Sequence, residues 1–117
     1  MNLYQRVYQQ NSVSTASPKT IIIRLHERAL FDIQTAKAAW KNGNIEEMRT
    51  HIQYIQDILA YLSGCADPKF EVTTTLVSLY NYYIVQLSKA FVEPSEELFT
   101  EVEGYLTEWK ETWAKAE

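Results

Sequence analysis

Apolar side chains return every three or four residues along four long segments of this chain, and short polar stretches separate the segments. This period places the apolar residues of each segment on one face of an α-helix. It predicts four helices of roughly 20 residues, each about 30 Å long. The expected core stripes are Ile22, Leu25, Ala29, Ile33, Ala36 and Trp40; Ile45, Met48, Ile52, Ile55, Leu59 and Leu62; Leu76, Tyr80, Tyr83, Leu87 and Phe91; and Leu98, Val102, Tyr105 or Leu106, Trp109 and Trp113.

The ends of the first helix carry clear signals. Ser17 is a favourable N-cap residue, because its hydroxyl can accept a bond from a free backbone N–H of the first turn. Pro18 suits the first helical position, where its missing N–H costs nothing. Gly43 can adopt the left-handed conformation that ends a helix. We therefore expect the first helix to run from Pro18 to about Lys41.

The later connections carry similar signals. Asn44, followed by Glu47, is typical of a capping box and should start the second helix. Residues 63–68 include a glycine and a proline and should break the chain again, so that the third helix begins between positions 68 and 73. Ser95 can cap the fourth helix.

Connections of a few residues force consecutive helices to be antiparallel neighbours. The predicted fold is therefore all-α: an antiparallel up-down-up-down four-helix bundle with an N-terminal arm. We expect one domain over residues 1–117, with the arm at 1–16 and the bundle at 17–117.

Composition narrows the class of protein. The formal charge of −4 argues against a nucleic-acid partner, which needs a basic face. Cys65 is the single cysteine, which excludes an internal disulfide framework and favours a reducing compartment. No apolar run approaches the roughly 20 residues that cross a bilayer, so no membrane insertion is expected. The first residues do not resemble a signal peptide.

Two helices carry more apolar residues than one core stripe needs. The second stripe of the second helix is Tyr54, Ile58 and Tyr61, and that of the third helix is Val72, Leu79 and Tyr82. If these residues are exposed, they form a patch that marks an interaction site, and tyrosine suits such a site. The spacing fits a partner helix lying in a groove. Alternatively, these residues complete a wide core or are covered by residues 1–16.

Three motifs resemble one protein family. They are Tyr8-Gln9-Gln10-Asn11-Ser12-Val13 with Thr15-Ala16-Ser17-Pro18, Leu79-Tyr80-Asn81-Tyr82-Tyr83, and Glu101-Val102-Glu103-Gly104-Tyr105 with Trp113-Ala114-Lys115. In this order and spacing the chain resembles the flagellin-specific export chaperones, the FliS family, over nearly its whole length.

The resemblance implies a cytoplasmic chaperone without catalytic activity. Its partner would be the disordered C-terminal region of flagellin, which becomes helical on the chaperone, is kept from premature assembly and is passed to the type III export apparatus. Together with the surplus stripes, the resemblance predicts these partner-binding residues: Tyr8, Val13, Tyr54, Ile58, Tyr61, Leu79, Tyr80 and Tyr82. We expect residues 1–16 to act as a movable lid, and the chain to be a monomer or a weak homodimer.

The chain also departs from that family. Residues 24–28 read Arg-Leu-His-Glu-Arg where the family often has Met-Leu-Tyr-Glu-Gly, and Asn81 replaces an aspartate. Val85 and Gln86 stand where the family often has two arginines. These changes leave room for a divergent paralogue.

Other chemistry is considered and set aside. A histidine phosphotransfer domain is also a four-helix bundle, and His26 is the candidate acceptor, but Glu27 and Arg28 do not suit a phosphate site. Glu47 and His51 could share a face, and we interpret them as a solvated pair rather than part of a metal site. We expect no catalytic residues, no metal and no cofactor. A third interpretation is a structural dimer formed through the surplus apolar patch.

Overall fold

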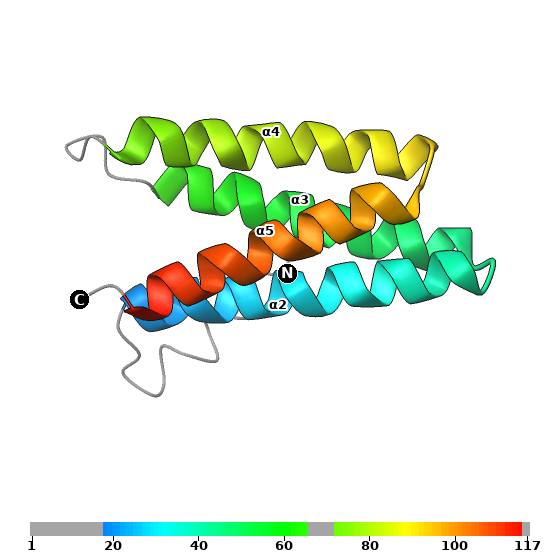
Figure 1. Cartoon of the computed structure of the whole chain (residues 1–117), viewed down its shortest axis with the longest axis horizontal. Coiled ribbons are helices and arrows are strands. Elements are labelled where there is room, and N and C mark those ends of the chain that lie inside the picture. Colours follow the sequence, from blue (N-terminus) through cyan, green and yellow to red (C-terminus); the bar gives the residue numbers. More distant parts are fainter. Residues whose placement is uncertain (1–17, 66–71, 116–117) are drawn as a thin grey trace.

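A computed structural model describes residues 18–65 and 72–115 of the chain. Four helices cover most of these residues: α2 (Pro18–Lys41), α3 (Ile45–Cys65), α4 (Val72–Val92) and α5 (Glu96–Lys115). Consecutive helices run in alternating directions (Figure 1). The predicted all-α four-helix bundle is confirmed, and the picture is consistent with the expected antiparallel order. The N-terminal arm lies outside the described residues.

The turn between α2 and α3 has the predicted chemistry. Gly43 has a φ of 79°, in the left-handed region. Its N–H donates to the Trp40 carbonyl at 3.0 Å, and the Asn44 N–H donates to the Ala39 carbonyl at 2.8 Å. This pair of bonds is the Schellman motif, which satisfies the last carbonyls of α2. The boundary of α2 at Lys41 is as predicted.

The starts of α3 and α5 are capped by the expected residues. The Asn44 side-chain oxygen accepts from the Glu47 N–H at 3.2 Å, and the Asn44 amide donates to the Glu47 carboxylate at 3.0 Å. The Ser95 hydroxyl accepts from the Leu98 N–H at 3.2 Å. One boundary differs: α3 continues through residues 63 and 64, so Cys65 is its exposed last residue rather than part of a loop.

The core follows the predicted stripes closely. Every stripe contributes to the buried cluster, and both Tyr105 and Leu106 are buried on α5. Two positions differ. Ile45 is exposed because it is the first residue of α3, beyond the reach of the neighbouring helices. Phe99, absent from the predicted stripe, is fully buried with its ring 5.5 Å from that of Trp40.

Polar contacts reveal which side of α3 faces each neighbour. Gln56 donates to the Ile84 carbonyl at 3.0 Å, and Arg49 donates to the Phe91 carbonyl at 3.1 Å, so this side faces α4. His51 bonds Asp32 of α2 from the other side. Helix α2 packs extensively against both α3 and α5, and α3 packs against α4. The helices therefore follow one another around the bundle, which places the α2–α3 and α4–α5 faces on opposite sides.

The contact between α4 and α5 is the least extensive of the four. The two helices lie close where they are joined and diverge towards the C-terminal end of α5, which lies beside the start of α2 (Figure 1). In this bundle the seam between α4 and α5 is therefore less tightly packed than the other three.

Candidate functional site

The first candidate surface lies between α2 and α3. Tyr54 is half-buried, and its ring stands edge-on to His51 with 5.5 Å between centroids. Phe31, which is 51% exposed, meets His51 in the same way at 6.3 Å. The Arg28 guanidinium lies over the Phe31 ring, 4.9 Å from its centroid. We call these four residues the α2–α3 face. Its aromatic and arginine content is typical of interface hot spots.

A buried carboxylate supports this face. Asp32 is fully buried, accepts a hydrogen bond from His51 Nδ1 at 2.8 Å, and is ion-paired with Arg28 at 3.4 Å. Burial raises the pKa of the Asp32 carboxyl, while the His51 hydrogen bond and the Arg28 charge oppose that rise. The expected Glu47–His51 pair is not formed, because Asp32 binds His51 and Asn44 binds Glu47.

Sequence reasoning missed Asp32. A signal was present, because Asp32 lies three residues after Ala29 and four before Ala36, within the buried side of α2. A polar residue at core spacing indicates a buried partner, since an unpaired buried charge is costly.

The second candidate surface lies between α4 and α5 and is built from aromatic rings. Tyr83 stacks on Tyr105 with 4.0 Å between centroids and 26° between planes. Tyr82 stands edge-on to Tyr83 at 4.9 Å, and Trp109 and Tyr80 stand edge-on to Tyr105 at 6.1 and 6.4 Å. Offset and edge-to-face pairs are the favourable geometries for such rings. We call Leu79, Tyr82, Tyr83 and Tyr105 the α4–α5 face.

Two members of this face were predicted from the sequence. Leu79 is half-buried and lies one turn before Tyr83 on the same side of α4. Tyr82 is 47% exposed, and its hydroxyl accepts a bond from the Gln86 amide at 2.8 Å. Gln86 therefore holds in place the most exposed tyrosine of the face.

A shallow open cleft lies beside the C-terminal end of α4. Its volume is about 490 Å³, and it is lined by Val85, Ser88, Lys89, Val92, Glu93 and Leu98. Val85 and Val92 are 56% and 71% exposed. Sequence reasoning noted Val85 as a family departure but did not include it in an apolar stripe.

Two predicted binding residues are core residues. Ile58 is fully buried in α3, and Tyr80 is 1% exposed in α4. Both side chains lie beneath the surface, within the core. Tyr80 was also predicted as a member of the core stripe, and that prediction is confirmed.

His26 is fully buried beneath Tyr80, so the phosphotransfer alternative is wrong: an acceptor histidine must be exposed. His26 Nδ1 donates to the Ile22 carbonyl at 2.9 Å, which leaves Nε2 to accept from the Tyr80 hydroxyl at 3.3 Å. Burial lowers the pKa of His26 and raises that of Tyr80 to about 12. Both groups are therefore neutral at pH 7.

The structure does not bring all the predicted residues together. Tyr54 and Tyr61 are seven residues apart and share the α2 side of α3, whereas Leu79 and Tyr82 lie on the α5 side of α4. The two pairs therefore belong to opposite sides of the bundle. Tyr8 and Val13 lie outside the described residues.

Comparison with known proteins identifies the relatives of this chain. The family model described as "Flagellar protein FliS" matches residues 1–117. A flagellar secretion chaperone FliS from Bacillus subtilis is 29% identical over 109 residues, covering 93% of this chain and 82% of the relative. Those from Campylobacter jejuni and Vibrio cholerae are 32% and 24% identical, covering 94% and 97% of this chain and 91% and 85% of the relatives.

The chain belongs to the FliS family. The resemblance inferred from three short motifs is thus confirmed, and it supports a role as a flagellar secretion chaperone.

Two other kinds of site are absent from the described residues. Among residues 18–65 and 72–115, no three histidine, cysteine, aspartate or glutamate side chains gather as a metal would require. Over the same ranges, no helix combines the length and the apolar character needed to span a membrane.

Proposed function

We propose that this FliS-family chain binds the C-terminal segment of flagellin in the cytoplasm, keeps it from polymerising before export, and delivers it to the flagellar type III export apparatus. The observation that carries the proposal is the exposed aromatic surface on a chain of the flagellar secretion chaperone family. The role is binding without catalysis.

The positions of the two faces suit a partner that is disordered before it binds. The α2–α3 and α4–α5 faces lie on opposite sides of the bundle, so a short rigid helix cannot contact both. A segment that folds on binding can wrap around the bundle and contact both faces. Because ordering the segment offsets part of the interaction energy, a large wrapped surface still allows release.

The predicted residues then divide into two roles. Leu79 and Tyr82 contact the segment on one side, and Tyr54 and Tyr61 contact it on the other. Tyr80 and Ile58 hold these surfaces in place from the core.

The N-terminal arm completes the proposal. Tyr8 and Val13 contribute to binding, and residues 1–16 act as a movable lid that covers apolar surface until flagellin arrives. Without flagellin the chain is a monomer or a weak homodimer. Deleting residues 2–14 should leave the helical circular dichroism of the bundle intact while changing flagellin affinity. Unfolding of the bundle on deletion would show instead that the arm belongs to the core.

Titration calorimetry with a flagellin C-terminal peptide from the same cell tests the function. We expect binding with a negative heat-capacity change, because apolar surface is buried. Absence of heat, together with failure to co-elute with monomeric flagellin, would refute the proposal.

Two tyrosine variants test the surfaces. Tyr82→Glu and Tyr61→Glu should weaken binding strongly, because a charge in a desolvated interface loses its hydration without gaining a partner. Tyr82→Phe, the matched control, keeps the ring and should bind within a few-fold of the wild type. If the glutamate variants unfold and bind only in proportion to their folded fraction, these tyrosines belong to the core.

A further inference from the structure

The two helices that form the α4–α5 face differ sharply in charge. Helix α5 carries six glutamates and two lysines, whereas α4 carries Lys89 as its single charged residue. Helix α4 therefore offers few positive charges to pair with the glutamates of α5.

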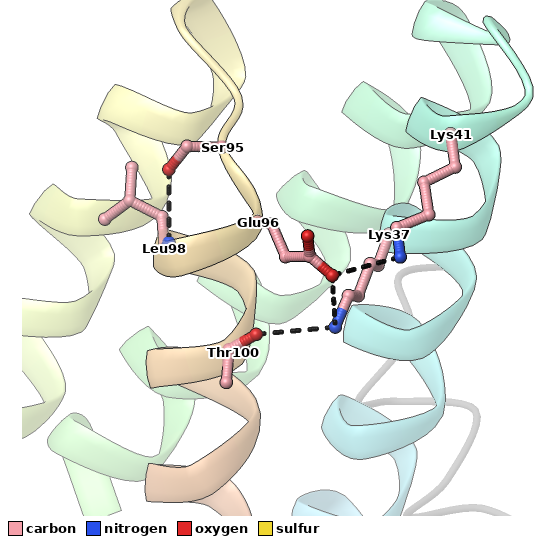
Figure 2. A network of polar contacts seen from close by, with 6 residues as sticks. All are labelled: Lys37, Lys41, Ser95, Glu96, Leu98 and Thr100. Carbon is pink, nitrogen blue, oxygen red and sulfur yellow. Dashed lines mark hydrogen bonds and ion pairs between the residues drawn. The ribbon is translucent and has the colours of Figure 1, made fainter.

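On the side of α5 that faces α2, the glutamates are matched. Glu96 is ion-paired with Lys41 at 3.1 Å and with Lys37 at 3.8 Å, and Lys37 also donates to Thr100 at 3.4 Å (Figure 2). Two turns further along, Glu103 accepts a bond from Gln34 at 3.1 Å. Helix α2 supplies a donor for each of these carboxylates.

On the side of α5 that faces α4, the glutamates are not matched. Glu101 lies four residues before Tyr105 and Glu108 three residues after it, so both share the side of α5 whose Tyr105 ring stacks on Tyr83. Burial raises the pKa of the Tyr83 hydroxyl, and the nearby Glu101 and Glu108 charges add to that rise. Within the described ranges neither carboxylate forms an ion pair or a hydrogen bond with another side chain. Two unbalanced negative charges therefore border the aromatic seam.

The same seam holds a polar group without a partner. Tyr105 is 7% exposed, and its buried hydroxyl forms no hydrogen bond with any described residue. Buried polar groups are hydrogen-bonded in most native structures, and an exception needs a reason. Within the described residues, this seam therefore contains a buried polar group that the chain leaves unsatisfied.

We propose that the α4–α5 face binds an amphipathic helix that carries lysine or arginine beside its apolar row. The apolar row lies on Leu79, Tyr82 and Tyr83, and the cations lie against Glu101 and Glu108. The two glutamates are seven residues apart, about 10 Å along α5. The matching cations of the partner are therefore two helical turns apart, about seven residues in its sequence. The helix is part of the flagellin segment, so this inference rests on the proposed function.

The test compares a variant that lacks the charges of Glu101 and Glu108 with a control variant that lacks two other glutamate charges of α5. Glu101→Gln/Glu108→Gln is the test variant, and Glu96→Gln/Glu103→Gln is the control, which loses the same charge from the side of α5 that faces α2. Calorimetry with the flagellin C-terminal peptide at about 50 and about 300 mM salt measures the affinity, since salt screens exposed charges. Circular dichroism verifies that both variants remain folded.

We expect the test variant to bind about tenfold more weakly than the wild type at low salt, corresponding to the loss of about two exposed ion pairs. It should also lose most of the salt dependence, whereas the control binds like the wild type. A peptide whose lysines and arginines are replaced by glutamine should bind the wild type more weakly, yet bind the test variant no more weakly than the unmodified peptide does.

The outcomes separate the two proposals. If the wild type does not bind the flagellin peptide at all, the proposed function fails. If the wild type binds but the test variant binds equally well, or the control weakens equally, the charge-matched docking is refuted while the proposed function stands.

Discussion

The two sides of helix α5 make different kinds of contact with their neighbouring helices. Towards α2, α5 packs Phe99 against Trp40 in the core and closes the surface with Glu96, Lys37 and Lys41. Towards α4, contact is thinner and consists mainly of stacked aromatic rings, bordered by Glu101 and Glu108 without counter-charges. In the first seam α2 supplies partners for the glutamates that face it, whereas the second seam leaves Tyr82, Glu101 and Glu108 exposed.

Helix α4 is held by hydrogen bonds from both α2 and α3. The Tyr80 hydroxyl crosses the bundle to His26 of α2, and Gln56 of α3 bonds both the Ile84 carbonyl and Ser88. These bonds hold α4 in place independently of its contact with α5. The comparison shows that α5 meets α2 through a buried aromatic contact closed by surface ion pairs, whereas α4 is tied to α2 and α3 by hydrogen bonds.

The largest loss of stability should follow from truncating an aromatic side chain in the α2–α5 seam, compared with the same truncation in the α4–α5 seam. Phe99→Ala should lower the free energy of unfolding by about 3–5 kcal/mol, because it leaves a cavity between α2 and α5. Tyr83→Ala, in the half-exposed aromatic stack, should cost about 1–2 kcal/mol. Urea unfolding measures both. Equal losses would show that the α4–α5 seam is as closed as the α2–α5 seam.

The next largest effect should appear on acidification. Because burial lowers the pKa of His26, the folded protein binds a proton there less readily than the unfolded chain does. Stability should therefore rise with pH through the window between the lowered pKa and the ordinary value near 6.5, and fall as pH drops through it. Melting temperatures at several pH values from about 7.5 to about 5 measure this dependence.

The variant His26→Phe tests whether this pH dependence comes from the buried hydrogen bond between His26 of α2 and Tyr80 of α4. His26→Phe keeps an aromatic ring but cannot take up a proton, so its melting temperature should fall less on acidification than that of the wild type. If the two profiles run parallel, the pH dependence arises from groups other than His26. The bond between His26 of α2 and Tyr80 of α4 is then not the source of the pH sensitivity.

A smaller effect should follow from removing the cap that starts α5. Ser95→Ala removes the acceptor for the Leu98 N–H and should cost about 1 kcal/mol. Ser95→Asp, which also caps well, should restore most of that loss. Thermal unfolding measures both variants. If Ser95→Asp remains as unstable as Ser95→Ala, the serine acts through packing rather than capping.

The smallest effect should come from the surface charges between α2 and α5. Lys41, followed by Lys37, lowers the pKa of Glu96, which is fully exposed. Glu96→Gln should therefore reduce the melting temperature slightly at low salt and hardly at all at high salt, because salt screens exposed pairs. Glu97→Gln serves as the control in the same first turn. A large, salt-independent loss would show that the Glu96 cluster stabilises the fold far more than its exposure allows.

Local chemistry was enough to predict the four helices and most of their ends; the end of α3 is the exception. Pro18, Gly43 and Ser95 act on the backbone within a few residues of themselves, so their effect can be read without any tertiary contact. The apolar period similarly identifies one face of each helix, which is why nearly every predicted stripe residue lies in or against the core. The family, inferred from three motifs, also followed from the order of residues alone.

Tertiary structure decided how these helices are turned and which of them meet. The burial of Phe99 and Asp32 depends on the position of a neighbouring helix, and the period of a single helix does not contain that information. The surplus tyrosines were predicted as one patch, yet Tyr54 and Tyr82 lie on opposite faces because α3 and α4 present different sides to their neighbours. Whether a glutamate of α5 is matched likewise depends on the helix across from it: α2 supplies lysines, and α4 supplies tyrosines.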